Sequence, residues 1–73
     1  MKPEIIAKHD TVIFELECNH FNELFYIVND VMTDDFEAFY FYRYDAEQER
    51  SAYERAARFY NSLVPDEECV PLF

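Results

Sequence analysis

The 73-residue sequence predicts a small α+β domain, with an antiparallel sheet of about three strands and one or two helices packed on it, the long one at the C-terminus. Residues 11–18 alternate apolar and polar side chains, as a half-buried strand does. Residues 36–44 hold six aromatics in nine positions, and residues 45–63 combine a helix cap with apolar side chains at helical spacing. We expect residues 1–64 to form a single domain and 65–73 an acidic tail.

The composition favours a folded core despite the small size. Hydrophobic residues make up 51% of the chain and aromatic residues 19%, unlike acidic disordered tails. Glycine is absent, so tight turns are expected to use Asp10, Asn19, Asp34 and Asp35, which are of the types that best tolerate left-handed backbone.

The N-terminal part is expected to form a hairpin. Residues 4–8 are a weaker extended candidate, and His9 and Asp10 would close the turn to the strand over residues 11–18. One side of that strand is expected to face the core and carries Val12, Phe14, Leu16 and Cys18.

Residues 20–32 fit two structures. Their apolar side chains recur at helical spacing, whereas residues 25–28 have the composition of a strand. The preferred interpretation is a helix with Asn19 as its N-cap.

Residues 36–44 are expected to form a central or covered strand, because apolar side chains occupy both of its faces. Phenylalanines Phe39 and Phe41 lie on one face, and the opposite tyrosine face consists of Tyr40, Tyr42 and Tyr44. If the C-terminal helix covers the phenylalanines, the tyrosine face needs another cover. Residues 20–32 would supply it, or a homodimer or partner interface, in which Tyr is enriched.

The C-terminal helix has the clearest signals. Asp45 is expected to be its cap, Gln48 completes a capping box, and Pro65 ends the helix. The stripe expected to be buried consists of Ala52, Ala56, Phe59, Tyr60 and Leu63.

The charge is one-sided. Sixteen acidic residues against six basic ones give a net charge of −10, and no Lys or Arg stands between Lys8 and Arg43, where eight carboxylates lie. Solubility alone rarely calls for a net charge beyond about 2–8 in a small domain. The surplus favours binding to a cationic partner, with these candidate residues: Glu15, Glu17, Glu23, Asp30, Asp34, Asp35 and Glu37.

These features predict a non-enzymatic acidic protein that blocks a basic, nucleic-acid-binding surface of another protein. Alternate strand residues such as Glu15 and Glu17 lie about 6.6 Å apart, on the order of two phosphate steps along a DNA strand. The acidity argues against nucleic acid or an anionic membrane as a direct ligand. Small size and extreme charge resemble phage- or mobile-element-encoded inhibitors of host defence. The alternative is an accessory homodimer whose acidity only keeps it soluble.

No motif supports catalysis, a metal or a cofactor. The soft ligands His9, Cys18, His20 and Cys69 lack the paired spacing of zinc sites, and the acidic residues 34–37 lack the spacing and glycine of calcium loops. Both cysteines are expected to be reduced thiols, with Cys18 buried. No membrane span or signal segment is evident, so we expect a cytoplasmic protein, in the host cell if phage-encoded.

The chain ends in Leu72 and Phe73. The last five residues resemble the short Leu-Phe-ended peptides with which bacterial polymerases and accessory factors dock the sliding clamp, although the leading glutamine of those peptides is absent. The resemblance implies that the two apolar side chains fill a pocket on a partner. The alternative is a tail folded back on the domain.

Overall fold

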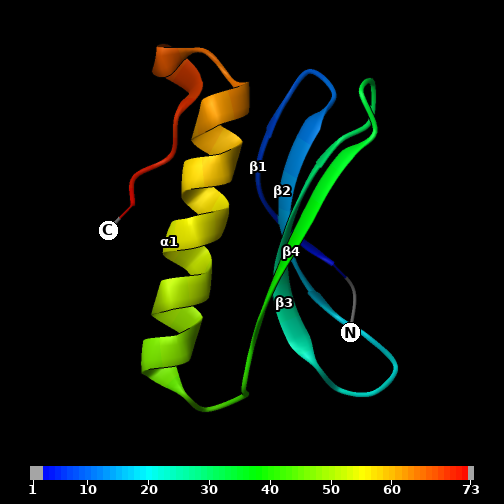
Figure 1. The fold of residues 1–73 in the computed structure, drawn as a ribbon, viewed down its shortest axis with the longest axis vertical. Helices are drawn as coiled ribbons and strands as arrows, with labels where there is room; N and C mark the ends of the chain where they lie inside the picture. Colours follow the sequence, from blue (N-terminus) through cyan, green and yellow to red (C-terminus); the bar gives the residue numbers. More distant parts are fainter. Residues whose placement is uncertain (1–2, 73) are drawn as a thin grey trace.

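The computed structural model describes residues 3–72 as four strands followed by a helix (Figure 1). The elements are β1 (Glu4–His9), β2 (Val12–Cys18), β3 (Leu24–Asp30), β4 (Asp35–Phe41), α1 (Ala46–Leu63) and the short 3-10 helix η1 (Asp66–Glu68). The strands pair antiparallel in the order β1-β2-β3-β4. The expected α+β fold with a long C-terminal helix is therefore confirmed, with four strands in place of about three.

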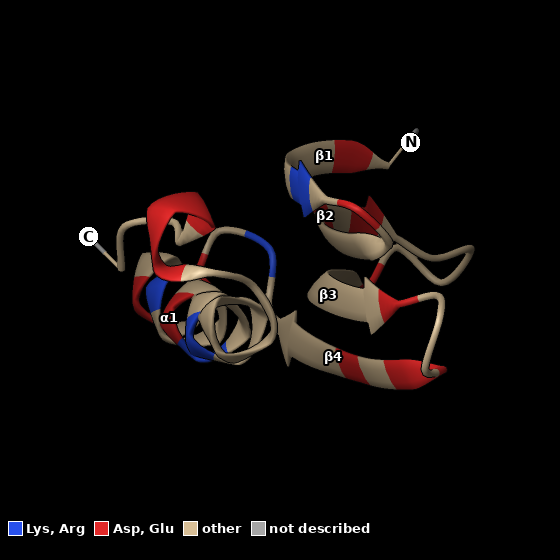
Figure 2. Ribbon diagram, turned by 90° about the horizontal axis from the view of Figure 1, so that it is seen from above, with Lys and Arg blue, Asp and Glu red and all other residues tan. Residues whose placement is uncertain are grey.

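The two faces of the sheet differ. Helix α1 lies against one face, and no helix or strand of the described residues lies on the other (Figure 2). Strands β1 and β4 are the edges, because each pairs with a single neighbour among these residues. We call the uncovered side the open face.

The N-terminal hairpin is confirmed, but its turn lies at Asp10 and Thr11 because His9 still pairs with Val12 in the sheet. Strand β2 begins at Val12, and its residue Phe14 pairs with Ala7 of β1 and Val28 of β3. Asp10 turns the chain at a φ of 52°, and Asp34 does the same between β3 and β4 at 63°. These two aspartates take the left-handed positions that a glycine would otherwise supply.

The helix expected over residues 20–32 is wrong. Residues 24–30 form β3, a central strand that pairs with both β2 and β4. The segment combines apolar side chains at helical spacing with the composition of a strand, but only an extended strand places Tyr26 and Val28 together under α1 and pairs the backbone of both neighbouring strands. Asn19 is accordingly not a helix cap, and the segment does not cover the tyrosine face.

The expectation of a central or covered strand over residues 36–44 is also wrong. Strand β4 is an edge strand that ends at Phe41. Phe41 faces α1 and is buried, whereas Tyr40, Tyr42 and Tyr44 are 56%, 74% and 96% exposed. Apolar side chains on both sides of a strand usually indicate that other elements pack on both sides. Here only the side that faces α1 is packed in this way.

The core lies between the sheet and α1. Phe14 is fully buried, with its ring 5.9 Å from that of Tyr26, 5.5 Å from that of Tyr53 and 5.7 Å from that of Tyr60. The buried face of α1 includes Ala52, Ala56 and Tyr60, as expected; Ala57 joins them, while Phe59 and Leu63 are only partly buried. Alanines let the helix approach a sheet built from large aromatic side chains.

The cap of α1 forms as expected. The carboxylate of Asp45 accepts a hydrogen bond from the Gln48 backbone N–H at 3.1 Å. The Gln48 side chain does not return to Asp45; its Oε1 accepts from the Tyr42 N–H at 3.3 Å, and Asp45 N–H donates to the Tyr42 carbonyl. The cap therefore also fixes the connection from β4 to the helix.

The tail folds back along α1 (Figure 1). The Asn61 side chain donates to the Val70 carbonyl at 3.0 Å and accepts from the Val70 N–H at 2.8 Å. Val70 and Leu72 pack against the core, which matches the folded-back arrangement. Phe73, the other residue of the suggested docking motif, lies outside the described residues.

We expect Phe14→Ala to lower the free energy of unfolding by about 3–5 kcal/mol, because it leaves a cavity beneath α1. Asp45→Ala should lower the free energy of unfolding by about 1 kcal/mol through loss of the helix cap. The surface control Tyr44→Ala should change it by no more than about 0.5 kcal/mol. Urea unfolding followed by circular dichroism measures all three. A larger loss for Asp45→Ala than for Phe14→Ala would contradict this account of the core.

Candidate partner-binding surface

The open face is an array of side chains on four strands. Alternation along the strands and their register place on it Ile5, Lys8, Ile13, Glu15, Glu17, Phe25, Ile27, Asn29, Phe36, Ala38 and Tyr40. One line of cross-strand neighbours on this face runs from Glu17 of β2 to Phe25 of β3 and on to Tyr40 of β4. The face thus changes from acidic on β2 to aromatic on β3 and β4.

The aromatic half of the face is exposed and ordered by ring contacts. The Phe25 and Tyr40 rings lie 5.0 Å apart, and Phe36 is more than half exposed at the β4 edge. Ile27 is only 6% exposed although no helix covers it, because neighbouring side chains close over the centre of the sheet. Exposed aromatic side chains around a dry centre are typical of binding surfaces.

The acidic half contains a carboxylate pair. Burial raises the pKa of Glu15 above its ordinary value of 4.5, and the charge of Glu17 and a hydrogen bond with it raise the pKa further. Two like-charged groups thus share a partly buried position, an arrangement that disfavours the ionised form. A cation bound between them would remove this penalty.

The other predicted acidic residues lie elsewhere. Glu23 is in the β2–β3 loop next to Tyr40, Asp34 and Asp35 are at the β3–β4 turn, and Glu37 is exposed on the helix side of β4. The seven predicted residues therefore do not form one patch. Glu15, Glu17 and Glu23 are the three on or beside the open face.

Asp30 has a structural role. Its Oδ1 accepts hydrogen bonds from the Thr11 hydroxyl and the Met32 N–H, each at 3.1 Å. Desolvation, which raises the pKa of Asp30, is outweighed by the hydrogen bonds from Thr11, Met32 and Thr33, which lower it. This carboxylate closes the β3–β4 turn.

The charge is divided between the two layers. Between Glu4 and Phe41 the sheet and its loops carry nine carboxylates and one lysine, whereas Arg50, Arg55 and Arg58 all lie on α1. In Figure 2 the blue positions lie mainly on the helix, whereas red positions follow the strands and turns and also occur on α1 and η1. The sheet layer is therefore the more negative side of the molecule.

Sequence reasoning missed the apolar members of the open face. Phe25, Ile27 and Phe36 were expected in a helix or in a covered strand. The strand-like composition of residues 25–28 was the available signal, and it could be interpreted only through the pairing of β3 with both neighbours.

Within residues 3–72 no three His, Cys, Asp or Glu side chains come together as a metal-binding group. Cys18 is half-buried rather than buried, and Cys69 is exposed; both are free thiols. No helix in the described part of the chain is long and apolar enough to cross a membrane.

Comparison with protein-family models, with curated proteins and with solved structures finds no match to this chain.

We expect Glu15→Gln to raise the melting temperature at pH 7. A carboxyl whose pKa is higher in the folded than in the unfolded state binds its proton more tightly when folded, so stability falls as pH rises above about 4.5. The gain should vanish at about pH 3, where Glu15 is protonated in both states. Thermal unfolding at the two pH values tests this.

The matched control is Glu67→Gln, which removes one charge from exposed η1. It should shift the melting temperature at pH 7 less than Glu15→Gln does. Equal gains for the two variants would show that general charge repulsion, and not the Glu15–Glu17 pair, is responsible.

Proposed function

We propose that this chain is a non-enzymatic acidic binding protein whose open face occupies a cationic, nucleic-acid-binding surface of another protein. The observation that carries the proposal is the composition of the sheet layer, where nine carboxylates and one lysine accompany an uncovered face with exposed aromatic side chains. Acidic side chains alone would only keep the protein soluble. Acidic side chains next to exposed apolar ones also suit an interface with another protein.

Electrostatics favours a cationic protein as the partner. The negative layer repels phosphate, so a direct nucleic-acid ligand would have to overcome the full charge of the sheet. A groove lined with Lys and Arg is attracted at a distance and held at contact by the same carboxylates. Inhibition by occupying such a groove, as phage-encoded anti-defence proteins do, is the function we assign to the surface.

The positions of Glu15 and Glu17 support this assignment. Alternate residues on one face of a strand lie about 6.6 Å apart, on the order of two phosphate steps along a DNA strand. Burial, and then the charge of Glu17, raise the pKa of Glu15, so a pair of lysine or arginine side chains would stabilise the ionised pair.

A displacement assay tests the proposal. Proteins from a lysate of the source organism are loaded on immobilised duplex DNA, and the chain is added at increasing concentration. We expect wild-type protein to release a basic protein, and the Glu15→Lys/Glu17→Lys variant to need at least about tenfold more, because like charges then face the groove.

The control variant, Asp66→Lys/Glu67→Lys, changes the net charge equally but lies in η1, outside the open face. It should release the same protein as wild type does. Polyglutamate of equal charge is the second comparison. If polyglutamate or the open-face variant is as effective as wild-type protein, the proposed surface is wrong.

A homodimer through the open face is the second candidate, favoured by the exposed side chains of Ile5, Phe36 and Tyr40 and by the unpaired outer edge of β4. Two copies would bring two negative sheets together, which opposes association at low salt. High salt screens this repulsion and would allow a dimer to form. The first proposal nevertheless predicts a monomer in sedimentation equilibrium at both low and high salt. A dimer at high salt that Phe36→Glu dissociates would favour the accessory-module function instead.

A further inference from the structure

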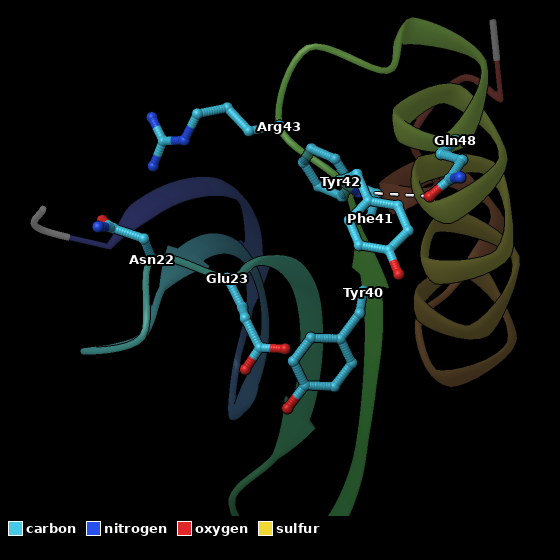
Figure 3. A pocket seen from close by; sticks show the side chains of 7 residues that line it. All are labelled: Asn22, Glu23, Tyr40, Phe41, Tyr42, Arg43 and Gln48. Carbon is cyan, nitrogen blue, oxygen red and sulfur yellow. Dashed lines mark hydrogen bonds between the residues drawn. The ribbon is translucent and has the colours of Figure 1, made fainter.

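A pocket of about 350 Å³ lies where the β2–β3 loop meets the end of β4 (Figure 3). Its walls include Glu23 from the loop, Tyr40 and Tyr42 at the end of β4, Arg43, and Gln48 from α1. Tyr40 also belongs to the open face, so the pocket is continuous with the proposed binding surface. Its volume is in the range of small-ligand sites, about 300–1,000 Å³.

The loop holds Glu23 in a fixed position. Asn19 Oδ1 accepts hydrogen bonds from the N–H groups of Phe21 and Glu23, at 2.9 and 3.0 Å, and Asn19 Nδ2 donates to Glu23 Oε1 at 3.0 Å. Within residues 3–72, Oε2 of Glu23 has no hydrogen-bond donor and no cation forms an ion pair with the carboxylate. One oxygen of an oriented carboxylate is therefore available to a ligand.

The ring of Tyr40 is also oriented. It packs on Phe25 with ring centroids 5.0 Å apart and planes inclined by 39°, yet it remains 56% exposed. Figure 3 shows the Glu23 carboxylate directed toward this ring. A carboxylate beside an aromatic ring binds a cation in two ways, through a charge-assisted hydrogen bond and through the electron density of the ring.

We propose that Glu23 and Tyr40 form a receptor for a single arginine side chain of the partner protein. The inference rests on the proposed function, since it assumes a partner rich in basic residues. The guanidinium group fits both walls better than an ammonium group does, because it is planar, stacks on aromatic rings and carries several N–H donors, of which one can reach the available Glu23 Oε2 while the plane lies on the Tyr40 ring. The receptor anchors the partner at the aromatic end of the open face.

Arg43 borders the receptor without occupying it. Its guanidinium donates to Cys18 Sγ at 3.7 Å and in Figure 3 extends away from Glu23 and Tyr40. Its charge repels an incoming arginine at short range. Replacement of Arg43 by glutamine should therefore strengthen binding of an arginine side chain.

The test uses the complete chain and a small probe. N-acetyl-arginine amide and its neutral isostere N-acetyl-citrulline amide are titrated at constant ionic strength and followed by two-dimensional amide NMR. We expect saturable shifts at Glu23 and Tyr40 with the arginine compound and none with the citrulline compound. Glu23→Gln and Tyr40→Ala should each weaken binding by about fivefold, and Arg43→Gln should strengthen it by about twofold.

Matched controls are Glu67→Gln for lost charge and Tyr44→Ala for a lost exposed ring outside the pocket. Both should bind the probe within twofold of wild type. Equal binding of the citrulline compound, or equal weakening by Glu67→Gln, overturns the receptor even if a pocket variant fails to fold, because the probe comparison needs only wild-type protein.

The probe experiment tests the receptor and the DNA-displacement assay tests the proposed function, so either one can be contradicted without the other. Displacement without arginine binding leaves the acidic open face as the functional surface and removes the receptor. Arginine binding without displacement keeps the receptor and shows that its partner is a basic protein other than one held on DNA.

Discussion

A four-stranded sheet has two faces, and the described chain supplies a single helix to cover them. Helix α1 packs by its alanines on the side of Phe14, Tyr26 and Val28, and the fully buried Phe14 ring is the centre of that contact. The opposite face keeps apolar side chains without a cover. Small domains bury a smaller share of their surface than large ones, and here part of the exposed apolar surface lies on that face, at Ile5, Phe36 and Tyr40.

The acidity of the sheet layer serves more than one purpose. Asp10 and Asp34 adopt left-handed turn conformations, Asp30 closes a turn by hydrogen bonds, and Asp45 caps the helix. Asp10 and Asp34 replace glycine at left-handed positions, whereas Asp30 and Asp45 act through their carboxylates. Glu15 and Glu17 have no such role, and burial together with the neighbouring charge of Glu17 raises the pKa of Glu15 and disfavours its ionised form. A pair that works against stability on an uncovered face is more informative about binding than the total charge is.

The β2–β3 loop connects turn chemistry to the proposed receptor. The hydrogen bonds by which Asn19 closes the loop are the same ones that orient Glu23. Tyr40 is oriented independently, through its contact with Phe25 on the neighbouring strand. The two groups that would contact an arginine are therefore positioned before the ligand arrives, which lowers the entropic cost of binding.

Local signals in the sequence determined much of the fold. The alternation over β2 and the Asp45 cap were sufficient to predict these elements and their buried sides, because short-range periodicity and hydrogen bonding decide them. The same reasoning identified Glu15, Glu17 and Glu23 as candidates, although it grouped them with carboxylates that the fold separates.

Only the tertiary structure decided the state of residues 20–32 and the environment of the tyrosines. The segment fits a helix and a strand about equally, and the choice depends on backbone hydrogen bonds to β2 and β4, which are distant in sequence. Once these residues form the third strand, they cannot lie over the sheet. The open face, with Tyr40 beside Glu23, exists because the segment expected to cover the tyrosines became part of the sheet.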